Sequence, residues 1–347
     1  MQTISTYSWL GRLPSGRPVV LVLVVLAVFP FLMPNKSIAI QVLIWSIFAL
    51  SYNILLGYTG LLSFSHASFF GIGSYAAALF LKNVYPSLVI AILLGLISSF
   101  LAGILLGWLS LRRRGVTFSM LTLAFNQMIF FLAFQVLEEY TGGDDGLPGV
   151  PTPSIRIPGL GTIPLVSVRY PENFYYFSYI VFAVCFVTMW KVLRSPFGYS
   201  LLAINESEER ARATGYHTTV IQVLAFALAA AFAGVAGVLN TLYLAYVPIM
   251  SLHLLTSGSV LMMTILGGRE SFIGPILGAL LYWIMADMIS RYTEFWMLYV
   301  GLIFMITVLL LRNGLAGLLW WVYQKLLALA ERVWARAKPR EVPAARE

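Results

Sequence analysis

Charged residues and cysteine are scarce in this sequence. Only 10% of its 347 residues are charged and 60% are hydrophobic, with a mean hydropathy of +0.86. Soluble domains carry about 25% charged residues, so the composition excludes an ordinary soluble protein and predicts an integral membrane protein. Cys185 is the single cysteine, which excludes an internal disulfide and a thiolate metal site.

Enzyme motifs are absent as well. No lysine follows a glycine, so the chain has no G-x-x-x-x-G-K-[ST] phosphate loop and is not expected to hydrolyse ATP. It contains no G-x-S-x-G and no H-E-x-x-H, and His66, His217 and His253 are widely spaced. We therefore expect no catalytic residue, no cofactor and no metal. The net charge of +8 does not indicate nucleic-acid binding, because the basic residues stand at the ends of apolar runs.

The sequence is instead a series of apolar runs. A transmembrane helix needs about 20 predominantly apolar residues. Candidate spans are residues 19–33, 37–56, 62–81, 87–111, 116–137, 174–193, 220–244, 254–266, 272–289 and 295–311. The runs at 62–81 and 254–266 are short or interrupted by glycine. We predict an all-α integral membrane protein with about ten transmembrane segments, including broken helices, in a transmembrane domain of residues 19–312.

The distribution of basic residues predicts the orientation. If residues 1–18 form a cytoplasmic N-terminus, seventeen of the 22 lysines and arginines face the cytoplasm. The five that face outward are Lys36, Lys82, Arg156, Arg169 and Arg291. Both termini are then expected to be cytoplasmic.

The tail, residues 313–347, has the pattern of an amphipathic helix. Its apolar positions share one helical face: Leu315, Leu319, Val322, Leu326, Leu329 and Val333. We expect a helix that lies on the inner leaflet, with Trp320 and Trp321 at the headgroup boundary. An eleventh span is the alternative, but its charges at 325, 331 and 332 would be costly inside a bilayer.

Two long polar interruptions divide the apolar runs. Residues 138–173 are rich in glycine and proline and are expected to form an irregular periplasmic loop or short lid, either docking a partner or only connecting two spans. Residues 194–219 are expected to face the cytoplasm. There Pro196 and Gly198 predict a turn, Asn205 and Glu208 a capping box that opens a short helix, and Gly215 its end.

That short helix has acidic residues before basic ones, the order that a helix dipole favours. It suits docking to a soluble partner, although a solvated loop helix without a partner is the alternative. The candidate docking residues are Asn205, Glu206, Glu208, Glu209, Arg210, Arg212 and Gly215.

The third feature is a glycine- and serine-rich stretch at membrane depth, GYTGLLSFSHASFFGIGSYAAALF, from Gly57. Glycines permit a helix break that lines a cavity, and SFIGPILGALL at 271–281 repeats part of the pattern in the second half. His66 is either functional or a neutral histidine that hydrogen-bonds a serine or a carbonyl at the break. The candidate path residues are Ser63, Ser65, His66, Ser68, Gly71, Gly73, Asn53 and Gly274.

These motifs occur in order with the external GGDDGLPGV, the segment RSPFGYSLLAINESEERARATGY, then AFALAAAFAGVAGVL and LGGRESFIGPILGA. Together they resemble the LivM-type permeases of branched-chain amino-acid ABC importers over about residues 37–312. In that family residues 209–215 match the E-x-x-x-x-x-G core of the coupling loop that docks on the ATPases. Two departures are Ser65, where glycine is commoner, and Ser74, where alanine is commoner.

The resemblance implies a non-catalytic permease in the bacterial inner membrane, working with a second, LivH-type permease, two ABC ATPases and a periplasmic solute-binding protein. Leucine, isoleucine and valine are the implied substrates. A urea or short-amide importer is one alternative, because such importers use similar permeases. An ion-coupled secondary transporter is another, but it would call for carboxylates within the spans, and only Asp287 lies near one. A purely structural membrane subunit would have no use for paired broken helices.

Overall fold

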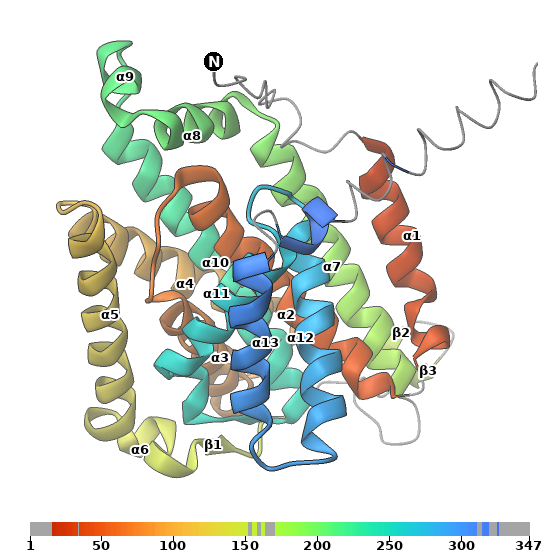
Figure 1. Cartoon of the computed structure of the whole chain (residues 1–347). Helices are drawn as coiled ribbons and strands as arrows, with labels where there is room; N and C mark the ends of the chain where they lie inside the picture. Colours follow the sequence, from red (N-terminus) through yellow and green to blue (C-terminus); the bar gives the residue numbers. More distant parts are fainter. Residues whose placement is uncertain are drawn as a thin grey trace, which may run out of the picture.

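The computed structural model describes residues 16–33, 35–85, 87–151, 155–157, 161–163, 171–310, 314–318 and 325. Each of the ten predicted segments corresponds to a helix of one bundle (Figure 1). These helices are α1 (Gly16–Leu32), α2 (Lys36–Asn53) continued by the π-helix η2 (Ile54–Thr59), α3 (His66–Asn83), α4 (Leu88–Ser110), α5 (Val116–Phe131) continued by the π-helix η3 (Leu132–Val136), α7 (Pro171–Leu193), α10 (Thr218–Leu244), α11 (Leu254–Gly267), α12 (Gly274–Ser290) and α13 (Trp296–Leu310). Within the described residues, five helices are long and apolar enough to cross a membrane and four shorter apolar helices accompany them. The prediction of an all-α membrane protein is confirmed.

The short elements lie at the two ends of the bundle. One end carries α8 (Pro196–Glu206) and α9 (Glu208–Ala213), and the other carries α6 (Glu138–Thr141) and β1 (Leu147–Pro148) (Figure 1). The loop predicted to be irregular also holds the 3-10 turn η4 (Gly143–Asp145), β2 (Ile155–Ile157) and β3 (Gly161–Ile163), which pair antiparallel. β4 (Tyr246–Val247) follows α10 and pairs with β1, in register Leu147 to Val247, before the 3-10 turn η5 (Ile249–Leu252).

Burial divides the helices into central and peripheral ones. In the most apolar 18-residue window, 89% of the α2–η2 segment and 72% of α10 are buried, against 22% for α4 and 28% for α5 and η3. The core is rich in aromatic rings, and Phe48 of α2 packs on Phe70 of α3 with ring centroids 4.8 Å apart. A helix that is apolar on all sides can be buried in protein or exposed to lipid, so the pattern of packing, not the sequence period, decides which helix is central.

Proline in α1 leaves a carbonyl that another helix satisfies. Pro30 has no N–H, so it cannot donate to the carbonyl of Leu26 four residues earlier. The hydroxyl of Tyr175 in α7 donates to that oxygen at 2.5 Å, and Tyr179 donates to the carbonyl of Leu23 at 2.8 Å. A bilayer offers no water to a free carbonyl, so a side-chain donor is needed there. The two tyrosines supply such donors and thereby attach α1 to α7.

Small residues allow α3, α4 and α10 to pack with their backbones in contact. A Cβ on Gly73 would lie 2.5 Å from the Cα of Gly234, and one on Gly237 would lie 2.0 Å from the carbonyl oxygen of Phe70. Small residues at helix contacts are the usual means of close packing inside membranes. The glycines of the third predicted span therefore serve helix packing as well as a helix break.

Replacing Gly237 with alanine is expected to destabilise the protein by about 3 kcal/mol, because overpacking against a fixed backbone forces α3 and α10 apart. The matched control is Gly301→Ala in α13, where a Cβ would meet no atom within 4 Å. Thermal denaturation in detergent, followed by size-exclusion chromatography, should show a lower midpoint for the first variant only. Equal midpoints would contradict the packing role.

The third predicted span is a broken segment, as expected. Gly60 adopts the left-handed conformation, with φ of 72°, and ends η2. Residues 60–65 are not helical, and α3 begins only at His66. Ser65 stands at the N-cap with a negative φ of −90°, so this position accepts a serine without strain.

The predicted cytoplasmic N-terminus, residues 1–18, and the predicted amphipathic tail, residues 313–347, lie almost wholly outside the described residues. Of these two regions the structure describes 16–18, 314–318 and 325.

Candidate functional site

The polar segment between α7 and α10 folds as two helices, not as one helix starting at Asn205. Asn205 lies in the last turn of α8, and Ser207 is the N-cap of α9, with its side chain accepting from the Arg210 amide at 3.3 Å. The predicted capping box at Asn205 and Glu208 is therefore wrong. Ser207 takes the cap because its backbone is extended, with φ of −159°, whereas Asn205 is still helical. Two acidic residues directly after Ser207 are the sequence signal for this start.

The predicted turn at Pro196 and Gly198 is also wrong. Pro196 occupies the first turn of α8, where its missing N–H costs nothing. Gly198 lies inside α8, and a Cβ there would be 1.9 Å from the carbonyl oxygen of Leu193. The glycine permits α8 to fold back tightly on the end of α7.

Glu208 connects three parts of the chain. Its carboxylate accepts hydrogen bonds from Arg212 and from Thr218 at the start of α10, each at 3.0 Å. It also forms an ion pair with Arg114 of the α4–α5 loop at 2.5 Å, and only 19% of its side chain is exposed. The carboxylate thus holds α9 against α10 and the α4–α5 loop.

Glu208→Gln is expected to lower the stability of the protein by about 2 kcal/mol, because hydrogen bonds to a charged group are the stronger ones. High salt should shrink the difference from wild type, since the arginines are exposed. Glu209→Gln is the control, as Glu209 is exposed in the same helical turn. Thermal midpoints at low and high NaCl would check this, and equal midpoints of the two variants would contradict it.

The other predicted docking residues are at the surface of the α8–α9 pair. Glu206, Glu209, Arg210 and Arg212 are exposed. Arg210 approaches Glu206 at 4.0 Å, a weak exposed pair. Gly215 follows α9 with φ of 92°, a conformation that favours glycine, and a Cβ there would meet no atom within 4 Å. The side chains of Glu206, Glu209 and Arg210 are available to a partner, whereas Glu208 and Arg212 are bonded to each other and to Thr218.

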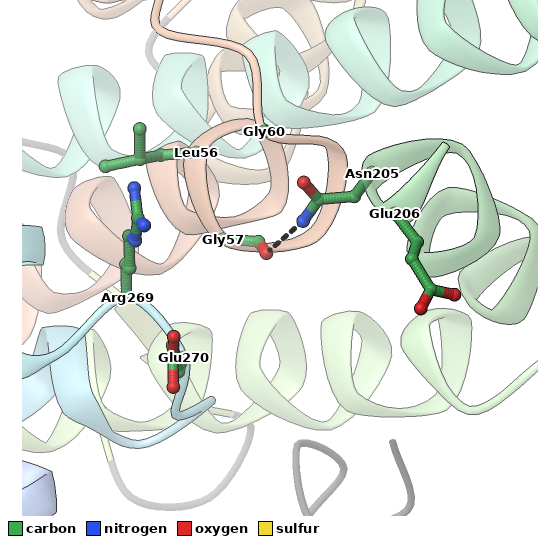
Figure 2. A pocket seen from close by; sticks show the side chains of 7 residues that line it. All are labelled: Leu56, Gly57, Gly60, Asn205, Glu206, Arg269 and Glu270. Atoms are coloured by element: carbon green, nitrogen blue, oxygen red, sulfur yellow. Dashed lines mark hydrogen bonds between the residues drawn. The ribbon is translucent and has the colours of Figure 1, made fainter. Parts of the chain in front are cut away.

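Asn205 points inward, away from that surface. Its amide Nδ2 donates to the carbonyl of Gly57 in η2 at 3.1 Å (Figure 2). A Cβ on Gly60 would lie 2.5 Å from Asn205 Oδ1, so the glycine makes room for the amide. One turn earlier, Asn53 Nδ2 donates to the carbonyl of Ser271 at 3.2 Å, in the α11–α12 turn. Two amide side chains therefore join α8 to η2 and the end of α2 to the α11–α12 turn.

A cavity of about 320 Å³ lies where these three segments meet. Its lining residues are Leu56, Gly57 and Gly60 of η2 and its end, Asn205 and Glu206 of α8, and Arg269 and Glu270 of the α11–α12 turn (Figure 2). Arg269 and Glu270 are not among the predicted site residues, because no local motif links them to residues 57 or 205.

The predicted path residues around His66 form a buried polar cluster. Ser63, Ser65, His66 and Ser68 are each 0% exposed. Ser63 and Ser65 are joined by their hydroxyls at 3.0 Å, and Ser68 donates to Asn126 Oδ1 at 2.8 Å. The backbone amide of Ala67, in the first turn of α3, donates to the hydroxyl of Ser257 in α11 at 2.8 Å. The start of α3 is thus bonded to side chains of α5 and α11, and Ser257 of α11 satisfies one of its free backbone amides.

His66 is hydrogen-bonded to a serine, as one of the two alternatives predicted. Its Nε2 lies 2.8 Å from Ser51 Oγ, and the Ser51 hydroxyl donates to the carbonyl of Phe48 at 2.7 Å. Because a hydroxyl has one proton, the Ser51 oxygen accepts from His66 and Nε2 is a protonated nitrogen. The ring stacks on Phe48 with centroids 5.2 Å apart.

The remaining predicted path residues lie elsewhere. Gly71 packs on Leu252 of η5, and Gly73 on Gly234 of α10. Asn53 and Gly274 lie beside the α11–α12 turn, where a Cβ on Gly274 would be 2.3 Å from the carbonyl oxygen of Gly268. The predicted path residues therefore fall into three groups. The serines and His66 form the polar cluster, Gly71 and Gly73 serve helix packing, and Asn53 and Gly274 lie at the α8–α9 end, in the joint between α2, η2, α8 and the α11–α12 turn.

Fold and site together define a class of protein. A multi-span helical membrane protein with a broken helix in its interior and a polar helix pair at one end has the architecture of a membrane transport protein. The chain belongs to the family of branched-chain amino acid transport system permease components, whose family model matches residues 36–311.

Two similar proteins carry the same description, high-affinity branched-chain amino acid transport system permease protein LivM. The LivM of Salmonella typhimurium is 31% identical over 299 residues, covering 80% of this chain and 69% of the relative. The LivM of Escherichia coli is 31% identical over 302 residues, covering 80% and 70% respectively. No solved structure matches the chain.

Proposed function

We propose that this chain is a permease subunit of an ATP-driven importer of leucine, isoleucine and valine in the bacterial inner membrane. Membership of the branched-chain amino acid permease family supports the substrate class. Its partners are a second, LivH-type permease, two ABC ATPases and a periplasmic solute-binding protein. The chain itself is non-catalytic.

Charge supports the placement of the α8–α9 end in the cytoplasm. Arginines of the α4–α5 loop, of α9 and of the α11–α12 turn lie at that end: Arg112, Arg113, Arg114, Arg210, Arg212 and Arg269. At the opposite end Lys36 is paired with Glu172, and Arg291 is paired with Asp287 at 2.6 Å. An excess of basic residues marks the cytoplasmic side, so both termini are cytoplasmic.

The observation that carries the mechanism is the hydrogen bond from Asn205 to Gly57. The exposed surface of α9, including Glu209, docks on an ATPase. When the ATPase moves, α8 moves with α9, and Asn205 transmits the displacement to η2. η2 leads directly into the broken segment and the polar cluster at His66. The path opens when this segment shifts, with Ser63, Ser65 and Ser68 exchanging their present partners for the passing solute. Such a change is a shift between two packed arrangements.

Reconstitution tests this function. Proteoliposomes holding the two permeases and two ATPases, with the binding protein outside and ATP inside, should accumulate radiolabelled leucine. Isoleucine and valine should compete, and urea and acetamide should not. A protonophore should leave uptake unchanged while ATP is maintained. Uptake that stops with the proton gradient would identify a secondary transporter, and competition by urea alone would identify an amide importer.

A further inference from the structure

The cavity at the α8–α9 end has the size and the mixed charge of a small-ligand site. Its volume of about 320 Å³ is at the lower end of the range for small-molecule pockets, roughly 300–1,000 Å³. Three segments from distant parts of the sequence form it. Arg269 and Leu56 lie on one side of the space, Asn205 and Glu206 on the other (Figure 2).

The charges select the chemistry of the ligand. Arg269 forms no ion pair with the residues that the structure describes. Within the described part of the chain, the one ion pair of Glu206 is the 4.0 Å contact with Arg210. The carboxylate of Glu206 disfavours phosphate or another anion, and the guanidinium of Arg269 disfavours a metal cation. A zwitterion satisfies both signs, because arginine binds a carboxylate through two parallel hydrogen bonds and Glu206 accepts from an ammonium group.

The walls also favour a compact ligand. Leu56, which is only 6% exposed, offers contact to a small apolar group, and the remaining contacts are glycine backbone, an amide and charged groups. A free α-amino acid of moderate size combines a carboxylate, an ammonium group and a small apolar part. We propose that this cavity binds the transported amino acid after its release, as a product site distinct from the path through the His66 cluster. The inference rests on the proposed function.

Binding there has a regulatory consequence. A ligand held between Arg269 and Glu206 joins the α11–α12 turn to α8, the same two segments that Asn205 and Asn53 attach to η2. It stabilises the present arrangement of the joint, and a ligand shifts a conformational equilibrium toward the state that it binds best. Product that accumulates on this side therefore slows the movement of α8 and restrains further import.

Two measurements test the product site. In the first, the purified complex of the two permeases and two ATPases, without the external binding protein, is titrated with radiolabelled leucine. Wild type should bind, and Arg269→Gln should weaken the affinity at least tenfold. Arg113→Gln should not, because Arg113 is exposed at the same end but does not line the cavity. Leucinol and isovalerate, which each lack one charge, should compete at least tenfold more weakly than leucine.

In the second, proteoliposomes of the full complex are preloaded with leucine on the cytoplasmic side. The ratio of uptake with and without this internal leucine should fall at least threefold for wild type and stay near one for Arg269→Gln. If the ratio is unaffected in wild type while uptake remains ATP-dependent, the product site is wrong and the proposed function stands. If neither wild type nor Arg269→Gln imports leucine, the proposed function fails. Equal leucine binding by wild type and Arg269→Gln would overturn the product site, whatever the result of the uptake measurement.

Discussion

Glu209→Lys is expected to abolish ATP-driven uptake without unfolding the permease. Glu209 is exposed in the first turn of α9 and lies within the segment that we propose to dock on the ATPase. A lysine reverses the charge that the partner meets, and juxtaposed like charges cost several kcal/mol at an interface. The cost to α9 itself is about 0.3–1 kcal/mol, from a cation near a helix N-terminus. Uptake by proteoliposomes should fall at least tenfold, and the ATPase should no longer co-purify.

The control is Glu294→Lys. Glu294 is also exposed but lies between α12 and α13, at the opposite end of the bundle. It should retain both uptake and the bound ATPase. Thermal midpoints of the two variants close to that of wild type would show that the loss is one of docking. Normal ATP-dependent uptake by Glu209→Lys would refute the docking surface.

Asn205→Leu is expected to separate ATP hydrolysis from transport. The substitution removes the donor to Gly57 O but leaves the exposed face of α9 intact. The complex should assemble and hydrolyse ATP, because docking does not depend on an inward-pointing amide. Uptake should fall at least tenfold, since the motion of α8 no longer reaches η2. The expected loss of stability is small, about 1 kcal/mol for one hydrogen bond.

The matched control is Ser200→Ala in the same helix. Ser200 Oγ donates to the carbonyl of Phe197 at 2.6 Å, a local bond that does not leave α8. It removes one hydrogen bond without breaking the connection to η2. We expect the ratio of leucine imported to ATP hydrolysed to be normal in this variant and low in Asn205→Leu. A normal ratio in both would show that Asn205 does not transmit the movement.

The features that depend on a single stretch of the chain could be predicted from the sequence. The helices could be predicted because each needs a long apolar run, and the break before His66 because glycine and serine interrupt one. Acidic residues precede basic ones in α9, but Glu206, which the sequence places in the same helix as Glu208 and Glu209, is the last residue of α8.

The start of α9 could not be predicted as reliably, because Asn205 and Ser207 are both good cap residues. In the structure the side chain of Asn205 is bonded to the carbonyl of Gly57, 148 residues earlier in the chain, and Ser207 caps α9. The cavity could not be predicted either, because residues near 57, 205 and 269 meet only in the folded bundle. The two glutamates also differ in burial for a reason that the local sequence does not contain. Glu208 is held by Arg114 and Thr218, whereas Glu209 is exposed, and no helical pattern connects Glu208 to those two partners.

The bond between the Ala67 amide and Ser257 has a consequence for biosynthesis. The donor is made 190 residues before its acceptor, and an unpaired amide is costly in a hydrocarbon environment. A nascent chain that has inserted α3 but not yet α11 therefore carries an exposed polar end. Helices made early must wait for the last third of the polypeptide, so a truncated first half should be a substrate for membrane quality-control proteases.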